Sequence, residues 1–153
     1  MKRYNLYALL LFSLVMLPLE CLANDPVQST VSPAGIWQGE WSSPRGFIYV
    51  AEMHLQDPSG GTIEGHINWT LRKSPRANEQ SKLGSTGTEF VKGSYEPTSR
   101  VLTLDGYRKT DPNGVLGLDK YKLIFAENGK VLGGITWNHG SWLGQIFLTR
   151  PPK

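Results

Sequence analysis

Two acidic residues, Glu89 and Asp119, lie in stretches of the chain that are otherwise rich in aliphatic and aromatic residues. Two carboxyl groups that face one cavity are the minimum for general acid–base chemistry. They can equally orient a polar or cationic group of a bound molecule. No nucleophile–base pair accompanies them in the sequence. We therefore expect a binding site, with a small hydrolase-type enzyme that uses Glu89 and Asp119 as the less favoured alternative.

Two histidines raise the question of a metal site. The expected hairpin places His54 opposite Glu64 and His66 opposite Glu52, all on its outer face. Two His and two Glu side chains on adjacent strands can ligate zinc. Cross-strand His–Glu pairs are also ordinary on a solvated sheet face. We favour the second interpretation and predict neither a metal site nor a cofactor.

The start of the chain has the composition of a secretory signal peptide. Lys2 and Arg3 precede an apolar stretch at 6–17, and Cys21-Leu22-Ala23 offers small residues at a cleavage site. This stretch is too short and wrongly flanked for a membrane span, and no membrane span is predicted elsewhere in the chain. We predict a signal peptide at 1–23, a flexible leader at 24–34 and a secreted or periplasmic domain at 35–150.

Charge and cysteine content exclude further classes. The chain of 153 residues has a net charge of only +3, and its basic residues are spread along it, so no nucleic-acid partner is predicted. The only cysteine, Cys21, leaves with the predicted signal peptide. The mature domain of about 130 residues must then be stabilised by one packed core without disulfides.

From Gly35 onward, polar and apolar residues alternate in short segments. Turn-forming combinations such as Asp-Pro-Asn-Gly and Glu-Asn-Gly separate these segments. The eight segments are 35–41, 46–56, 61–71, 87–95, 100–107, 116–126, 130–137 and 141–150. Short connections between successive strands make a meander, and eight such strands commonly close. The predicted fold is all-β, an eight-stranded antiparallel up-and-down barrel.

The hairpins predict which side chains point inward. Folding the second and third segments about their turn places Leu55 opposite Ile63. Folding the last three segments in the same way turns odd-numbered side chains from 121 to 137 and even-numbered ones from 142 to 148 toward one interior. Large residues then face glycines repeatedly, which fills a narrow interior without overpacking.

Strand direction separates a closed end from an open end. Trp37, Arg150 and the tight turns share one end, which we predict to be a floor. The longer connections gather at the other end, together with inward aromatic side chains and both carboxyl groups. The predicted ligand-binding residues are Trp41, Tyr49, Trp69, Glu89, Asp119, Tyr121, Trp137 and Trp142. We predict that this end binds a small amphipathic or aromatic ligand.

An apolar strip is predicted on the outer wall of the last three strands. Ile124 falls beside Leu132, and Leu132 falls beside Phe147, in the expected register. A contiguous apolar strip on an outer wall usually marks an interface. We therefore expect a homo-oligomer that forms through these strands.

The two ends of the predicted barrel resemble those of a known group. Gly35-Ile36-Trp37 and the terminal Phe147-Leu148-Thr149-Arg150 are similar to the first-strand Gly-x-Trp and the last-strand Arg of the calycins, which include lipocalins and avidins. The chain length and the meander look closest to an avidin. The resemblance implies that Arg150 covers Trp37 in a cation–π stack worth about 0.5–2 kcal/mol. The turn at 42–45 lacks the polar cluster by which avidins hold biotin, so the specificity stays unassigned.

A third class is a secreted inhibitor or protein-interaction barrel. Small barrels can block hydrolases with a leader or a loop, and two segments fit this role: the leader at 24–34 and the basic loop at 72–86. We prefer to interpret the 72–86 loop as a solvated lid over the open end.

Overall fold

The computed structural model describes residues 32–152 except for residues 60, 61, 139 and 141. The predicted signal peptide and almost all of the predicted leader lie outside the described residues. The elements are β1 (Gly35–Ser42), β2 (Ile48–Ser59), β3 (Thr62–Lys73), η1 (Ala77–Lys82), β4 (Thr86–Glu96), β5 (Val101–Thr110), β6 (Lys120–Phe125), β7 (Val131–Trp137) and β8 (Leu143–Thr149). Among the described residues, no helix has the length and apolar character needed to cross a membrane.

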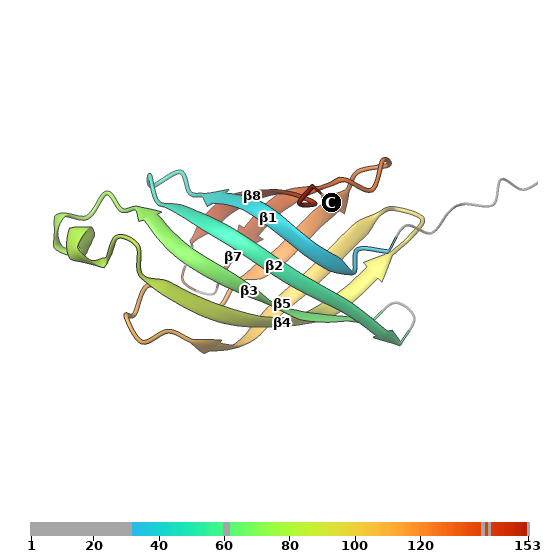
Figure 1. The fold of residues 1–153 in the computed structure, drawn as a ribbon, viewed down its shortest axis with the longest axis horizontal. Coiled ribbons are helices and arrows are strands. Elements are labelled where there is room, and N and C mark those ends of the chain that lie inside the picture. The colour runs from blue at the N-terminus through green and yellow to red at the C-terminus, as the bar shows by residue number, and fades with distance from the viewer. Residues whose placement is uncertain (1–31, 60–61, 139, 141, 153) are drawn as a thin grey trace, which may run out of the picture.

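The eight strands form a closed barrel in sequential order, as the sequence predicts (Figure 1). Each strand pairs antiparallel with its neighbours along the chain, and β1 pairs antiparallel with β8 to close the sheet. The closing register runs from Gln38 opposite Thr149 to Ser42 opposite Gln145. Closure leaves neither β1 nor β8 with an unpaired edge over this segment.

The β2–β3 hairpin differs from its predicted register by two residues. Leu55 lies opposite Gly65 rather than Ile63, because the pairing is irregular between Gln56 and Ser59. A shift of two residues preserves the faces of both strands, so Leu55 and Ile63 are still buried. It changes the outer pairs, however, because His54 lies opposite His66 instead of Glu64.

Strand β7 has the opposite facing from the one predicted. Phe125 pairs with Leu132 rather than with Val131, so Leu132 and Thr136 are fully buried inside the barrel while Ile135 is 56% exposed. The turn before β7 ends on Gly129 in the left-handed region (φ 68°). The connection between Phe125 and Leu132 thus has one more residue than the predicted connection between Phe125 and Val131. A slip of one residue exchanges the two faces of a strand.

The floor of the barrel is made by Trp37 and Arg150. Trp37 is fully buried, and the Arg150 guanidinium carbon lies 4.2 Å from the centroid of its ring. Arg150 also donates hydrogen bonds to the carbonyls of Ser32 (2.9 Å), Ala34 (3.0 Å) and Gly129 (3.0 Å). One side chain thereby ties the entry to β1, the β6–β7 turn and the end of β8 together.

The long connections lie at the opposite end. The segment that contains η1 projects beyond the strands at one end of the barrel (Figure 1). The connections that leave β1, β5 and β7 begin at the same end, because each follows an odd-numbered strand in the antiparallel meander. The barrel end with these longer connections therefore has room for a binding site, which short turns would leave no space for.

Candidate functional site

A cavity of about 270 Å³ opens at the end that holds the long connections. Its apolar wall consists mainly of aromatic side chains: Trp41, Phe47, Tyr49, Trp69 and Trp142. Its polar groups come from Arg76, Glu79, Glu89, Asp119 and Asn138, and residues 114–117 complete the rim. Ligand cavities usually measure about 300–1,000 Å³ and combine apolar walls with a few polar groups. This cavity lies at the lower limit of that range and has room for a small molecule.

The structure brings six of the eight predicted ligand-binding residues to this cavity: Trp41, Tyr49, Trp69, Glu89, Asp119 and Trp142. Tyr121 does not line the cavity. It is fully buried, and its hydroxyl donates a hydrogen bond to Glu89, which does line the cavity. Trp137 does not line the cavity. It lies at the open end of β7 as predicted, but the prediction that it points inward is wrong, because the facing of β7 turns Trp137 to the outer wall, opposite Leu143. Thr136 takes the inward position instead.

The aromatic walls meet edge to face. The ring centroids of Trp41 and Tyr49 lie 5.6 Å apart, those of Tyr49 and Trp69 lie 6.1 Å apart, and each pair is T-shaped. Gly144 makes this arrangement possible, because a Cβ atom at this position would lie 2.2 Å from the Trp41 indole. Such pairs stabilise a fixed geometry by about 0.5–1.5 kcal/mol each beyond their burial. The walls are therefore held rigidly by one another.

Glu89 is the central polar group of the inner end. Its side chain is only 2% exposed, and it accepts hydrogen bonds from Trp69 Nε1 (3.2 Å), from the backbone N–H of Asp119 (2.7 Å) and from the Tyr121 hydroxyl. Glycine at position 106, on the intervening strand β5, lets the carboxyl group pass, since a Cβ there would lie 1.9 Å from Glu89 Oε1. Glu89 on β4 and the backbone of Asp119, directly before β6, are thus hydrogen-bonded across β5.

Burial raises the pKa of Glu89 to about 7, because removal from water disfavours the charged carboxylate. The three donated hydrogen bonds oppose this shift, and the nearby Asp119 charge adds to it. Burial also raises the pKa of Asp119, while hydrogen bonds from Asn138 and Thr136 act in the opposite direction. Ionisation of both carboxyl groups at once is therefore unfavourable in this site.

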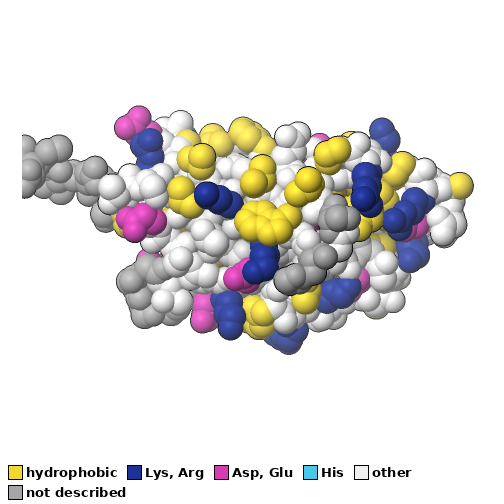
Figure 2. Space-filling model, turned by 180° about the vertical axis from the view of Figure 1, so that it is seen from behind, with side chains coloured by type: hydrophobic (Ala, Val, Ile, Leu, Met, Phe, Trp, Pro, Cys, Tyr) yellow, Lys and Arg dark blue, Asp and Glu magenta, His cyan; other side chains and the backbone are white. Residues whose placement is uncertain are grey.

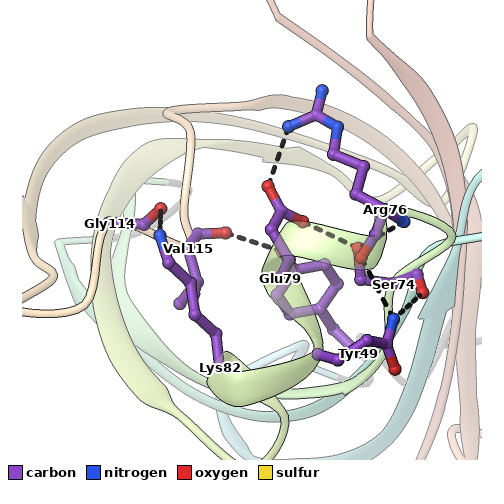
Figure 3. A network of polar contacts seen from close by, with 8 residues as sticks. Tyr49, Ser74, Arg76, Glu79, Lys82, Gly114 and Val115 are labelled. Atoms are coloured by element: carbon purple, nitrogen blue, oxygen red, sulfur yellow. Dashed lines mark hydrogen bonds and ion pairs between the residues drawn. The ribbon is translucent and has the colours of Figure 1, made fainter.

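A second polar network closes part of the open end (Figure 3). Glu79 on η1 accepts hydrogen bonds from Ser74 (2.7 Å) and Arg76 (2.8 Å), which Figure 3 shows as dashed lines from its carboxylate. The Arg76 guanidinium lies 5.3 Å from the ring centroids of both Phe47 and Trp142. The segment from Ser74 to Lys82 is therefore held against the aromatic wall.

The loop after β5 is fixed from inside and outside. The Asp111 carboxylate accepts hydrogen bonds from the backbone N–H groups of Val115 (2.9 Å) and Leu116 (2.8 Å). The Tyr49 hydroxyl donates to the Val115 carbonyl (2.6 Å), as Figure 3 shows. Lys82, on η1, donates a hydrogen bond from its Nζ to the Gly114 carbonyl (3.5 Å). These bonds place the rim residues of this loop beside the cavity.

Sequence reasoning missed Arg76, Glu79, Asn138 and the 114–117 rim as cavity residues. The sequence predicts a lid at 72–86, and this segment contributes Arg76 and Glu79 to the cavity, but the sequence did not identify these two residues. The Asp-Pro-Asn-Gly turn at 111–114 is the one local signal available, because Asp at the start of a turn caps following N–H groups. The remaining positions depend on contacts between loops that are far apart in the chain.

The outer-face histidines do not form the pairs that the metal hypothesis required. His54 and His66 stack at a centroid distance of 4.7 Å, and His54 contacts Glu52 on its own strand at 2.7 Å. In the part of the chain that the structure describes, no three His, Cys, Asp or Glu side chains are grouped so that they could hold a metal ion.

Fold and cavity together define a class: closed, eight-stranded antiparallel barrels with a small aromatic-lined cavity at one end. Solved structures of designed barrels are similar to this chain. The redesigned β-barrel mFAP1 bound to DFHBI has a TM-score of 0.58 at 15% identity, covering 76% of this chain and 94% of that one. The redesigned β-barrel mFAP0 bound to DFHBI has a TM-score of 0.57 at 16% identity, covering 76% of this chain and 97% of that one.

A third solved structure, EF1p2_mFAP2b bound to DFHBI, has a TM-score of 0.56 at 14% identity, covering 77% of this chain and 93% of that one. At these identities the similarity shows the fold alone. No protein-family model matches the chain, and no curated protein matches it.

Proposed function

We propose that this protein is a small-ligand-binding barrel whose site is the aromatic cavity at its open end. The observation that supports this most directly is the combination of a cavity of about 270 Å³, five aromatic walls and two carboxyl groups, one buried and one partly buried, in one place. A cavity of about 150 Å³ already accepts benzene in a protein core. The expected ligand is therefore a planar molecule of one or two rings with at least one polar group.

The designed neighbours bind DFHBI in barrels of the same fold. Their identity to this chain is too low to transfer the ligand, but DFHBI is a suitable first probe. The calycin-like character of the barrel, with Trp37 and Arg150 at its floor, is part of the same proposal. We further propose that residues 1–23 are removed on export, so that binding takes place outside the cytoplasm.

The alternatives receive less support from the geometry. An inhibitory loop must have side chains free to bind a target, whereas Arg76 of the 74–82 segment lies over Phe47 and Trp142 of its own barrel. A hydrolase of this kind also needs a nucleophile or a base beside its acid. Glu89 has a suitable pKa of about 7, but the cavity lining contains no Ser, Thr, Cys or His side chain among the described residues.

The proposal predicts that small aromatic compounds raise the melting temperature of the protein. A ligand present at 100 times its Kd stabilises the folded state by about 2.7 kcal/mol, which raises Tm by several degrees. Differential scanning fluorimetry with DFHBI and a panel of one- and two-ring compounds measures this. Trp41, Trp69 and Trp142 line the cavity, so intrinsic fluorescence gives a second signal.

Two variants make the result specific. Trp69→Leu removes a cavity wall and is expected to abolish the ligand-induced rise in Tm, whereas Trp137→Leu changes a tryptophan of the outer wall and is expected to preserve it. If no compound in the panel stabilises the protein, or if both variants respond alike, the proposed site is wrong.

A further inference from the structure

The inner end of the cavity presents hydrogen-bond acceptors and almost no free donors. The Trp41 indole N–H donates to Thr136 (2.7 Å), and the Trp69 indole N–H donates to Glu89 (3.2 Å). The Tyr121 hydroxyl also donates to Glu89, and the Tyr49 hydroxyl donates to the Val115 carbonyl. Each of these groups has its partner within the protein. A carboxylate can accept about four hydrogen bonds, so Asp119 and Glu89 retain acceptor capacity.

The same end contains acidic groups without a basic partner. Among the described residues, neither Glu89 nor Asp119 takes part in a salt bridge. Two nearby basic side chains are paired elsewhere. Arg76, which lines the cavity, pairs with Glu79 at 2.8 Å, and Lys109, opposite Glu89 in the strand register, pairs with Asp111 at 3.2 Å. An unpaired carboxylate that is almost fully buried is unfavourable, so it must take up a proton or a cation.

The aromatic walls favour the second solution. The faces of Trp and Tyr rings are negative, and a cation within about 6 Å of a ring centroid is attracted to them. Trp41, Tyr49 and Trp69 surround the space in front of the two carboxyl groups. Charge-assisted hydrogen bonds from such a cation to a carboxylate are about twice as strong as neutral ones.

We infer that the cavity selects a small planar organic cation, an aromatic amine or amidinium whose N–H groups bond to Asp119 and Glu89, and that its binding displaces a proton from this pair. This inference rests on the proposed function of the cavity and specifies the class of ligand. A neutral ring of the same shape fills the same walls but leaves the acidic pair uncompensated. An anion adds negative charge beside the two carboxyl groups and is excluded.

Proton displacement requires that few other groups facing Glu89 titrate near neutral pH. From β2 and β6, Tyr49 and Tyr121 have raised pKa values and stay neutral, that of Tyr49 at about 12. From η1 and the loop after β5, Glu79 and Asp111 have lowered pKa values and stay charged, each bonded to its cation, Arg76 or Lys109. Strand β3 contributes Trp69, which does not titrate. Glu89, with its pKa of about 7, is thus the group of the acidic pair that exchanges a proton near neutral pH.

The inference is tested by three probes of one shape: benzamidine, benzamide and benzoate, which are cationic, neutral and anionic between pH 6 and pH 8. Isothermal titration calorimetry at pH 8 is expected to show at least about ten-fold tighter binding of benzamidine than of benzamide, and no binding of benzoate. Benzamidine is expected to bind about ten-fold more weakly at pH 6, because a proton must then leave the site. Its binding is expected to release protons, which the dependence of the heat on buffer ionisation detects.

Variants separate this inference from the proposed function. Asp119→Asn and Glu89→Gln each neutralise one acid and are expected to reduce the preference for benzamidine over benzamide, whereas Glu40→Gln on the outer face is expected to preserve it. Asp119→Asn serves alone if Glu89→Gln does not fold. Equal affinity for benzamidine and benzamide, or affinity for benzamidine that does not change with pH, overturns the cation inference while a binding cavity remains. If aromatic compounds of the fluorimetry panel bind and benzamidine does not, the inference is also overturned; if nothing binds, both proposals are wrong.

Discussion

At the scale of single residues, the inner carboxyl groups illustrate what sequence alternation can predict. Glu89 and Asp119 were predicted to point inward from β4 and the start of β6, and both line the cavity. Their hydrogen bonds could not be predicted, because they depend on the passage that Gly106 leaves across β5. A glycine within a strand indicates a close approach but does not say which group approaches.

The raised pKa of Glu89 predicts how stability changes with pH. The folded chain keeps a proton on this carboxyl group up to about pH 7, whereas the unfolded chain loses it near pH 4.5. The stabilisation is therefore complete below the unfolded pKa and is lost as the pH rises through the folded pKa. Relative to Glu89→Gln, the free energy of unfolding of the wild type is expected to fall by about 2–3 kcal/mol between pH 5 and pH 8.

Urea denaturation of both proteins at several pH values measures this difference. Glutamine keeps the shape of glutamate but does not titrate, so other ionisable groups cancel in the comparison. If the difference in free energy of unfolding is constant with pH, or grows in favour of the wild type above pH 7, the pKa of Glu89 is not raised in the folded state.

At the scale of elements, β7 shows the limit of pattern analysis. Both faces of Val131-Leu132-Gly133-Gly134-Ile135-Thr136-Trp137 contain apolar residues, so the sequence itself does not select one. The turn decides the facing, because the pairing of Phe125 with Leu132 leaves one more residue between the strands than the predicted pairing with Val131. The polar–apolar alternation of β8 is less ambiguous, and its inward residues Gly144, Ile146 and Leu148 are the ones predicted.

The facing of β7 predicts different costs for two similar substitutions. Leu132→Ala empties part of the packed interior and is expected to reduce the free energy of unfolding by about 2–5 kcal/mol. Ile135→Ala removes a side chain that is 56% exposed and is expected to change it by no more than about 0.5 kcal/mol. Chemical denaturation of the two variants compares them directly. The reverse order would restore the facing that the sequence alone suggested.

At the scale of the whole molecule, the outer wall of β6–β8 has an apolar surface. Ile124 is 60% exposed and Phe147 is 59% exposed, and both flank Gly133, while Ile135 and Leu143 lie on the same wall. Figure 2 shows hydrophobic side chains across the face behind that of Figure 1, with Lys and Arg side chains among them. Leu132, which we had assigned to this strip, is buried inside the barrel, and Ile135 takes its place.

Self-association through this wall remains our prediction. Sedimentation velocity is expected to show a mass that rises with protein concentration, because burial of the wall against a second copy removes apolar surface from water. Phe147→Lys is expected to keep the protein monomeric. Tyr107→Lys replaces an aromatic residue on β5 that is 51% exposed, and it serves as the control. A monomeric mass at all concentrations for the wild type contradicts the interface.

The closed topology was the most predictable property, because eight alternating segments with short connections leave few other arrangements. The seam between β1 and β8 has a consequence for synthesis of the chain. The partner of Gln38 is Thr149, so the first strand leaves the ribosome long before its partner exists. Until the final strand emerges, the growing sheet has two open borders that can pair with other chains. We expect nascent chains that stall before residue 143 to be the species on which a chaperone acts.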